Sequence, residues 1–367
     1  MSSSDESVSW GILGTGGIAH KFARALSGCT TGRLVGVGSR AMESAVRFAD
    51  EFGAPRRYDS YDALLADPAI DSVYISLPNH LHAQWTIRCA EAGKHILSEK
   101  PLATNYAEAC QAVEAARTHD VFLMEAFMYR CHPQTARLVQ LVREGAIGQV
   151  RVIEASFGFN MGGPKVNIRQ QNAAAGGGIM DVGCYCMSMA RLIAGAASGQ
   201  DFADPVILQE GDEPRVAVKG FAHIGAESRV DEWATAAVTF PGDIVANLTC
   251  SIQVALERDV RIWGSAGHIV VPNPWTPGDE RFGGDQGTRI LVYRDGEAHV
   301  REEIVAGGQP LYTIEADTVA RHIQHRQAPS PCMTWADSLG NMAALDAWRK
   351  DIGLVFDNEK PDTGRIR

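Results

Sequence analysis

The 367-residue sequence has no excess of positive charge and no long apolar run. Its 34 lysines and arginines are outnumbered by 44 aspartates and glutamates, so the net charge is -10 and no global field would attract nucleic acid or an anionic membrane. The start, MSSSDESVS, lacks the basic and apolar segments of a signal peptide, and no later segment reads as a membrane span. We therefore expect a cytoplasmic protein with neither nucleic acid nor a membrane as its partner.

Paired cysteines are also scarce. The eight cysteines stand singly apart from Cys184 and Cys186, and a reducing compartment would keep them as thiols. A structural zinc site needs four ligands at recognisable spacings, and no second cysteine pair is present. We therefore expect no disulfide framework and no metal site.

What the sequence does contain is an alternation of strand-like and helical segments in its first third. Helices are expected over 18–26, 42–52, 81–92 and 106–117. Apolar, β-branched runs begin at Val8, Leu34, Ser72, His95 and Val121. This order predicts an α/β Rossmann domain at 8–130, a parallel sheet with helices on both faces, after a disordered arm at 1–7.

The first strand leads directly into GILGTGGIA, the dinucleotide fingerprint in its required place. Gly14 permits the turn, Gly16 leaves room for a pyrophosphate, and Ala19 lets the helix pack closely on the strand. Gly17 and Ile18 open that helix, whose free amides would face the phosphates. The segment predicts that a nicotinamide dinucleotide binds here.

The end of the second strand indicates which dinucleotide. NAD-specific folds usually carry an acid there, whereas this sequence has Ser39 and Arg40. A hydroxyl and a guanidinium can bind a 2'-phosphate that a carboxylate would repel. NADP is therefore favoured over NAD.

Polar residues follow the later strands, where such sheets bind their ligands. The third strand leads into the segment LPNHLH at 77–82, and the fourth ends in Glu99 and Lys100 before a proline. Farther on, GGGIMDVGCY places Asp181 and Tyr185 four residues apart, which predicts one shared helix face. The glycines before them suggest a helix N-terminus near a ligand.

GILGTGGIAH, the Glu99-Lys100-Pro101 loop and GGGIMDVGCY together resemble the glucose-fructose oxidoreductase, inositol dehydrogenase and MocA family. The segment MEAFMYRCHP at 124–133 and Tyr185 look most like its dihydrodiol dehydrogenases and NADP-dependent D-xylose dehydrogenases. The resemblance implies that Lys100 and Tyr185 flank the nicotinamide. It further implies cofactor contacts from Leu77, Pro78, Asn79, His82 and Glu99.

The resemblance and the chemistry of these side chains suggest a mechanism. Tyr185 would take the proton of a substrate hydroxyl while Lys100 binds the same oxygen, and the ammonium would favour the phenolate. Asp181 would orient substrate hydroxyls or Lys100, or would cap a helix instead. Many relatives have histidine in place of Tyr185, which leaves the proton carrier open. Arg130 and His132 are weaker candidates outside the catalytic set.

The second part of the chain has the period of antiparallel strands. Residues 131–333 predict an α+β domain with an open, mainly antiparallel sheet, followed by a C-terminal helix and tail at 334–367. Pro241-Gly242-Asp243 and Asp295-Gly296 are expected hairpin turns. Alternating Val238, Phe240, Leu248 and Ile252 suggest an uncovered apolar face, through which the chain would form a dimer or tetramer.

Three functions fit this sequence. The favoured one is an NADP-dependent oxidoreductase that transfers hydride between the nicotinamide and a sugar or cyclic diol. A sugar–sugar oxidoreductase with tightly bound NADP is the first alternative. A dinucleotide sensor without turnover is the second, because Rossmann domains host many roles.

Overall fold

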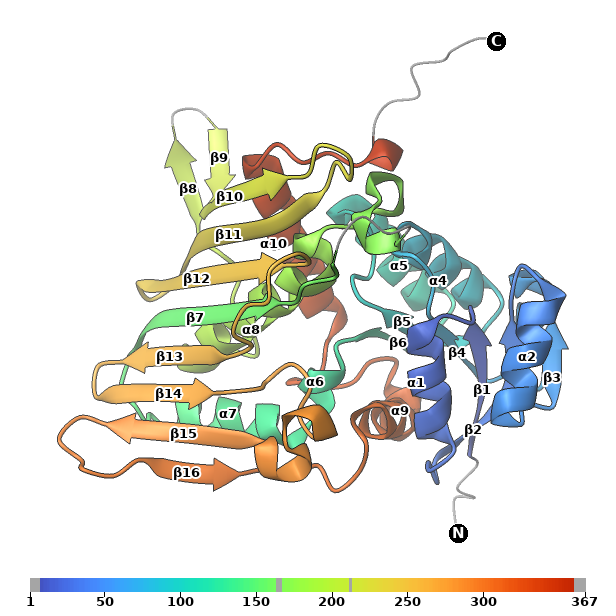
Figure 1. Ribbon diagram of the computed structural model, residues 1–367, viewed down its shortest axis with the longest axis horizontal. Coiled ribbons are helices and arrows are strands. Elements are labelled where there is room, and N and C mark those ends of the chain that lie inside the picture. Colours follow the sequence, from blue (N-terminus) through green and yellow to red (C-terminus); the bar gives the residue numbers. More distant parts are fainter. Residues whose placement is uncertain (1–6, 163–166, 211–212, 360–367) are drawn as a thin grey trace.

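The computed structural model describes residues 7–162, 167–210 and 213–359. They form a Rossmann half and a second half built on a larger sheet, which lie side by side (Figure 1). Almost all of the expected N-terminal arm, and residues 360–367 of the expected tail, lie outside the described residues.

The first sheet has six parallel strands in the order β3-β2-β1-β4-β5-β6. The strands are β1 (Val8–Leu13), β2 (Gly32–Gly38), β3 (Arg56–Tyr58), β4 (Ser72–Ile75), β5 (His95–Glu99) and β6 (Leu123–Ala126). The helices between them are α1 (Gly17–Leu26), α2 (Met42–Phe52), α3 (Tyr61–Leu65), α4 (His82–Glu91) and α5 (Tyr106–Thr118). Since the strand order reverses at β1, right-handed crossovers place α1 and α2 on one face and α4 and α5 on the other. The predicted Rossmann fold is confirmed.

Strand β3 and helix α3 were not predicted. β3 is a three-residue edge strand, and Arg56 and Arg57 are exposed, so its sequence carries no apolar alternation. Helix α3 has only five residues. Elements this short give the hydrophobic pattern too few repeats to be recognised.

The second sheet has eight strands in the order β10-β11-β12-β7-β13-β14-β15-β16. They are β7 (Val150–Gly158), β10 (Val218–Ile224), β11 (Asp231–Phe240), β12 (Ile244–Ser251), β13 (Val260–Gly264), β14 (Gly267–Val271), β15 (Arg289–Arg294) and β16 (Arg301–Ile304). Only β12 and β7 pair in parallel among its strands, which confirms the predicted open, mainly antiparallel sheet. A separate pair, β8 (Ile207–Glu210) with β9 (Glu213–Val216), stands beside it (Figure 1).

The two predicted hairpin turns have different outcomes. Residues 241–243 connect β11 to β12, and the positive φ of Gly242 and Asp243 makes the turn tight. The predicted two-residue turn at Asp295-Gly296 is wrong in length. Strand β16 begins only at Arg301, so the connection between β15 and β16 spans residues 295–300.

The predicted uncovered face of this sheet was the wrong one. Val238, Phe240, Leu248 and Ile252 are at most 1% exposed, because they face helices packed on the sheet. These helices are α7 (Pro133–Arg143), α8 (Cys184–Ala197) and α10 (Trp335–Asp351). The opposite side carries the exposed aromatic residues Phe221, Trp233, Trp263 and Tyr293. Alternation shows that a strand has two faces, but it does not show which of them later helices cover.

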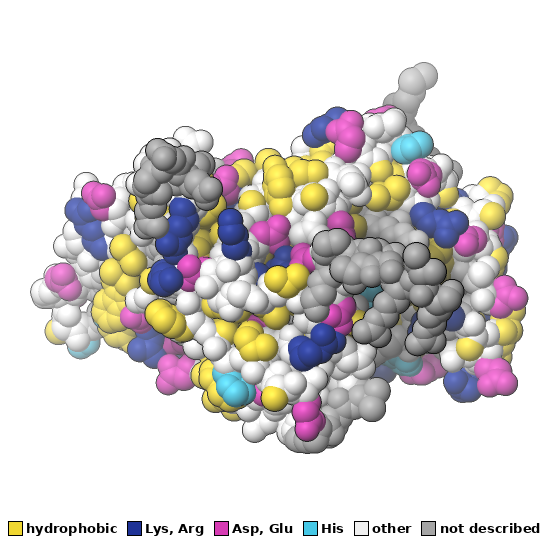
Figure 2. Space-filling view, turned by 90° about the horizontal axis from the view of Figure 1, so that it is seen from above, with side chains coloured by type: hydrophobic (Ala, Val, Ile, Leu, Met, Phe, Trp, Pro, Cys, Tyr) yellow, Lys and Arg dark blue, Asp and Glu magenta, His cyan; other side chains and the backbone are white. Residues whose placement is uncertain are grey.

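One stretch, Asn172–Ala197, is long and apolar enough to cross a membrane by length and composition, contrary to expectation. The most apolar part of this stretch is wholly buried inside the protein, as in the core helix of a folded domain. On the surface seen in Figure 2, acidic and basic side chains are interspersed.

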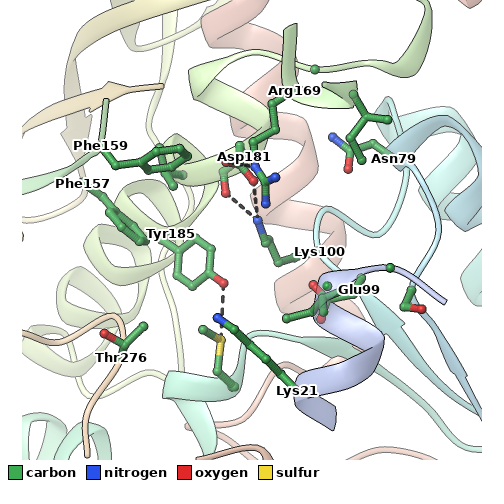
Figure 3. A pocket seen from close by; sticks show the side chains of 18 of the residues that line it. Lys21, Asn79, Glu99, Lys100, Phe157, Phe159, Arg169, Asp181, Tyr185 and Thr276 are labelled. Carbon is green, nitrogen blue, oxygen red and sulfur yellow. Dashed lines mark hydrogen bonds and ion pairs between the residues drawn. The ribbon is translucent and has the colours of Figure 1, made fainter. Parts of the chain in front are cut away.

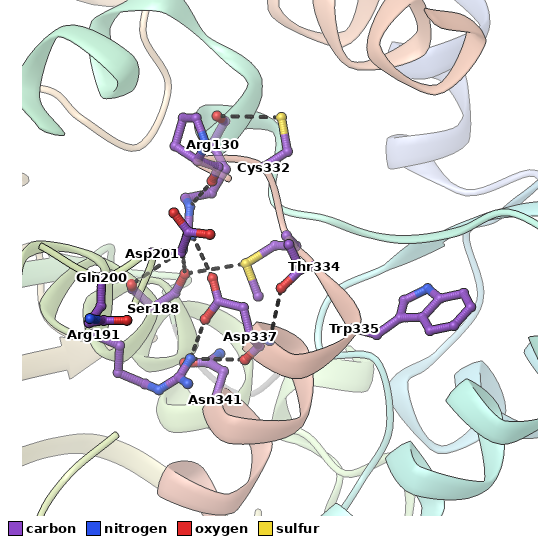
Figure 4. A network of polar contacts seen from close by, with 12 residues as sticks. Arg130, Ser188, Arg191, Gln200, Asp201, Cys332, Thr334, Trp335, Asp337 and Asn341 are labelled. Atoms are coloured by element: carbon purple, nitrogen blue, oxygen red, sulfur yellow. Dashed lines mark hydrogen bonds and ion pairs between the residues drawn. The ribbon is translucent and has the colours of Figure 1, made fainter. Parts of the chain in front are cut away.

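A buried ion-pair network joins three helices beneath the second sheet (Figure 4). Arg130 comes from the short helix α6 (Met128–Cys131), Arg191 from α8 and Asp337 from the first turn of α10. The Arg130 Nη2 lies 2.5 Å from Asp337 Oδ2, and Arg191 donates to the other oxygen of the same carboxylate. Arg130 also donates to Ser188 Oγ at 2.8 Å. The network therefore ties α6, at the end of the Rossmann half, to α8 and α10.

Candidate active site

The turn between β1 and α1 leaves an open, amide-lined space. Gly14 has φ +97°, and a Cβ there would lie 3.1 Å from both Ser76 O and Ser76 Oγ, so only glycine fits without strain. A Cβ on Gly16 or Gly17 would meet nothing within 4 Å, and no side chain caps the N-terminus of α1. Ala19 is fully buried where the helix meets the sheet. Free amides beside open space fit the pyrophosphate of a dinucleotide.

Ser39 and Arg40 lie beside this turn. The Gly14 amide donates to Gly38 O at 2.9 Å, which joins the turn to the end of β2. Ser39 is buried and Arg40 is exposed. Neither these two residues nor Pro78 line the cavity described next.

A cavity of about 670 Å³ lies between the Rossmann half and the second sheet. It begins at Gly16, Gly17 and Ile18 of the turn. The other predicted site residues that line it are Leu77, Asn79, His82, Glu99, Lys100, Asp181 and Tyr185. The structure thus brings together residues from the first strand connection, two later strand ends and the helix of the second half.

Lys100 and Asp181 form the centre of the cavity (Figure 3). The Lys100 ammonium donates to the Asp181 backbone oxygen at 2.6 Å and to Asp181 Oδ1 at 3.1 Å. Arg169 Nε binds the other carboxylate oxygen at 2.7 Å. Burial opposes the charge on Lys100, but Asp181 and the other acidic groups around it together outweigh burial and raise the pKa of this lysine. The pKa of Asp181 is lowered despite burial, because both cations favour its ionised form. Lys100 is therefore held as an ammonium.

Tyr185 lies beside this pair, but not as predicted. Lys100 Nζ is 5.1 Å from the centre of the Tyr185 ring, over its face, while the hydroxyl donates to Met128 Sδ at 3.3 Å. Burial, together with the nearby Glu99, raises the pKa of Tyr185 well above its usual value. This direction is opposite to the expectation that Lys100 would favour the phenolate, because burial and the acidic groups nearby raise the pKa while the ammonium is engaged by Asp181.

Asp181 and Tyr185 stand on a helical turn that differs from the predicted α-helix. Residues Ile179–Gly183 form a π-helical turn, and α8 follows from Cys184. Aromatic rings surround Tyr185, with Phe127 at 5.0 Å and Phe157 at 5.3 Å between ring centres. The rings hold the tyrosine in one orientation toward the cavity.

His82, Asn79 and Glu99 use much of their bonding capacity within the protein. The two ring nitrogens of His82 lie 2.7 Å from Pro101 O and Leu77 O, and burial lowers its pKa to about 4. The ring therefore lies between the two loops that carry Leu77 and Lys100, and in its neutral form it donates to one of the two carbonyl oxygens. Asn79 Nδ2 donates to Ala175 O at 2.8 Å, which links the two halves. Glu99 accepts from the buried Tyr74 hydroxyl, and burial raises its pKa.

The glycine run before Asp181 has a steric explanation that the sequence did not reveal. A Cβ on Gly177 would lie 2.1 Å from Asp231 Oδ1, and one on Gly178 would lie 3.2 Å from Asp231 Oδ2. The buried Asp231 carboxylate accepts from the Ile179 amide at 2.6 Å. Burial raises the pKa of Asp231 to about 7. The first amide of the helix therefore donates to a protein carboxylate, while Gly176 beside it lines the cavity, so a ligand near this helix start stays a prediction.

Several cavity residues were not found from the sequence. Lys21 reaches from α1 toward the space beside Tyr185 (Figure 3). Arg169, Arg258, Thr276 and Arg281 come from connections in the second half. The cavity is also lined by Met128, Phe157, Phe159 and Tyr312. Lys21 lies four residues from Gly17, one helical turn on, and this spacing could have identified it.

The residues left outside the predicted catalytic set lie elsewhere. Arg130 is part of the buried ion-pair network, and His132 caps α7 by accepting from the Gln134 amide at 3.1 Å. Within the described ranges, no group of three or more His, Cys, Asp or Glu side chains is placed to hold a metal ion. Cys184 and Cys186 are buried free thiols.

Comparison with known proteins identifies the family. Residues 8–127 match an oxidoreductase family with an NAD-binding Rossmann fold, GFO_IDH_MocA. Residues 135–270 match the GFO/IDH/MocA C-terminal domain. The chain belongs to the Gfo/Idh/MocA family. It is an oxidoreductase that acts on CH–OH groups, and its partners include a small-molecule substrate.

Three members of the Gfo/Idh/MocA family illustrate the likeness. The trans-1,2-dihydrobenzene-1,2-diol dehydrogenase of Homo sapiens is 31% identical, over 96% of this chain and 98% of its own. A D-xylose 1-dehydrogenase (NADP(+)) of Haloferax volcanii is 42% identical over 51% of this chain and 57% of its own. KijD10, a 3-ketoreductase from Actinomadura kijaniata solved with NADP and TDP-benzene, has a TM-score of 0.81 at 26% identity, over 95% of this chain and 98% of its own.

Proposed function

We propose that this protein transfers hydride between NADP and the CH–OH carbon of a sugar or cyclic diol. The observation that carries the proposal is the meeting of Lys100, Asp181 and Tyr185 in one cavity that begins at the open glycine turn. When bound, the nicotinamide supplies the hydride acceptor or donor. The names of the dihydrodiol and xylose dehydrogenase relatives support the substrate class.

The choice of NADP is supported by charge. Ser39 and Arg40 stand beside the Gly14 turn, at the place where an NAD-binding fold would carry an acid. The exposed guanidinium can turn toward a 2'-phosphate and bind it through two N–H groups. Two of the related proteins are named with NADP.

Lys100 and Tyr185 have separate roles in this proposal. The ammonium, kept charged by Asp181, binds the reacting oxygen and stabilises negative charge on it. The neutral Tyr185 hydroxyl donates the proton to a carbonyl oxygen in the reducing direction. Oxidation requires the phenolate instead, which burial disfavours, so oxidation should accelerate as pH rises. Asp181 acts as the positioning residue for Lys100.

The test is the rate of NADP reduction at 340 nm in a screen of aldoses, polyols and dihydrodiols. With a working substrate, we expect Tyr185→Phe and Lys100→Met each to lower kcat by roughly 10²–10⁴-fold, the usual contribution of proton transfer or charge stabilisation. Tyr106→Phe is the matched control, because this exposed tyrosine lies outside the cavity. Near wild-type kcat/KM in both site variants would refute the assignment.

We further propose that copies of the chain associate through the uncovered face of the second sheet, in a cytoplasmic setting. On that face His223 stacks on Trp233 at 4.0 Å, and Trp263, His268 and Tyr293 form a second stack at 4.5 and 4.4 Å. Exposed aromatic groups of this kind favour burial against a partner. The eight free cysteines support a reducing compartment.

A further inference from the structure

Arg258 is a cation of the cavity that the proposed hydride transfer does not use. It stands just before β13 and lines the cavity together with Phe157 and Thr276. Its guanidinium carbon lies 4.7 Å from the ring centre of Phe157 and 4.5 Å from that of Phe282. Stacking of this kind engages the flat faces of a guanidinium, so its N–H groups remain available only at the edge.

The edge of Arg258 has unused hydrogen-bonding capacity. Its Nη2 donates to Thr276 Oγ1 at 3.3 Å. Its Nε is buried and has no hydrogen-bond partner among the described residues. A buried N–H on a charged group is costly to leave unpaired, and because Arg258 lines the cavity, its other N–H groups are suited to an acceptor from outside the chain.

The carboxylates nearest to Arg258 in sequence, Glu257 and Asp259, are both bound by Arg261, through Nη2 at 3.0 Å and Nε at 2.7 Å. Asp279, whose charge also acts on Arg258, is bound by Arg281 through Nε at 3.0 Å and Nη2 at 2.6 Å. Burial and the charge of Arg281 lower the pKa of Arg258. No ion pair involves Arg258 in the part of the chain that the structure describes.

The other arginines of the cavity differ in this respect. Arg169 is neutralised by Asp181, and Arg281 by Asp279. Arg258 instead contacts Phe157, whose ring centre is 5.3 Å from that of Tyr185. The unpaired charge of Arg258 and the proposed proton donor Tyr185 therefore both lie next to the Phe157 ring.

We infer that Arg258, with Thr276 beside it, binds a carboxylate carried by the substrate, so that the preferred substrates are acidic sugars. A carboxylate in the cavity can accept charge-assisted hydrogen bonds from the guanidinium N–H groups that line it beside Thr276. This inference rests on the proposed sugar or diol chemistry of the same cavity. It adds that the protein recognises the substrate through a carboxylate that is separate from the reacting carbon.

The experiment compares D-glucuronate, D-glucose and D-glucose 6-phosphate as substrates of the full chain with NADP. The acid and the neutral sugar differ at C6, and the phosphate ester tests whether any anion suffices. We expect kcat/KM to be highest for glucuronate. In Arg258→Gln it should fall by roughly 10- to 100-fold for glucuronate, the effect of losing a charge-assisted pair, and by less than about 2-fold for glucose. Arg258→Lys should keep part of the preference for glucuronate over glucose, because lysine retains the positive charge but lacks the planar guanidinium donors.

Three further measurements keep the outcomes distinct. Arg143→Gln removes an exposed arginine of α7 outside the cavity, and it should leave the glucuronate-to-glucose ratio unchanged. The KM for NADP should be the same in Arg258→Gln. Calorimetric titration of glucuronate without cofactor measures binding even if no compound is turned over, which separates failure of this inference from failure of the proposed function.

Equal losses for glucuronate and glucose in Arg258→Gln would overturn the inference, since the guanidinium would then only hold Phe157 and Phe282 in place. A raised KM for NADP with an unchanged substrate ratio would do the same. A preference for the phosphate ester over glucuronate would refute the carboxylate as the recognised group.

Discussion

Removal of the Asp337 carboxylate should strongly destabilise the protein. In Asp337→Ala, Arg130 and Arg191, whose side chains are both 0% exposed, lose the carboxylate that they share. Arg130 keeps only neutral partners such as Ser188, whereas Arg191 keeps Asp204. Breaking a buried pair leaves an uncompensated charge and costs about 3–5 kcal/mol, and we expect a loss in this range.

Asp204→Ala is the matched control for this prediction. It removes a second carboxylate from Arg191, but the Asp204 side chain is 59% exposed, so water screens the interaction. Its loss should cost less than about 1 kcal/mol. The free energy of unfolding is measured by urea titration, with circular dichroism and tryptophan fluorescence as probes. If Asp337→Ala and Asp204→Ala lower the free energy of unfolding by amounts within about 0.5 kcal/mol of each other, burial does not determine how much each carboxylate contributes to stability.

Three other predictions follow from single side chains. Burial raises the pKa of Glu125 to about 7, so the free energy of unfolding should fall as pH rises from about 4.5 through 7. Glu125→Gln should remove this fall, which amounts to about 2.5 kcal/mol between pH 5 and 8 in urea titrations. Arg40→Ala should raise KM for NADP by roughly 10-fold and leave KM for NAD unchanged, and equal effects on both would mean that Arg40 misses the 2'-phosphate. Trp263→Glu should shift sedimentation toward the monomer, and an unchanged profile would exclude this sheet face as the interface.

The Rossmann half was predictable because its pattern is local. Strand, glycine turn and helix follow one another within residues 8–26, and polar residues mark the ends of β4 and β5. The pairing of Lys100 with Asp181 was within reach only through the family resemblance, since 81 positions separate them. Their hydrogen bond depends on how the second half docks.

The remaining features depend on contacts that one segment does not encode. The glycines at 177 and 178 fit against Asp231, more than 50 positions later, so their meaning could not be read from their own segment. The pKa of Tyr185 follows from burial, which a sequence spacing does not show. Arg258 gains its significance only from the rings that stack on it and from acids already paired elsewhere.

The Lys100–Asp181 contact also limits how members of the family can be recombined. Lys100 is supplied by the Rossmann half and Asp181 by the helix of the second half, so neither half contains the charge pair by itself. A chimaera that exchanges one half for that of a relative gains a working pair only if the new boundary restores the docking between them. Swapping halves to change the substrate is therefore a harder route than redesigning side chains such as Arg258 within one intact chain.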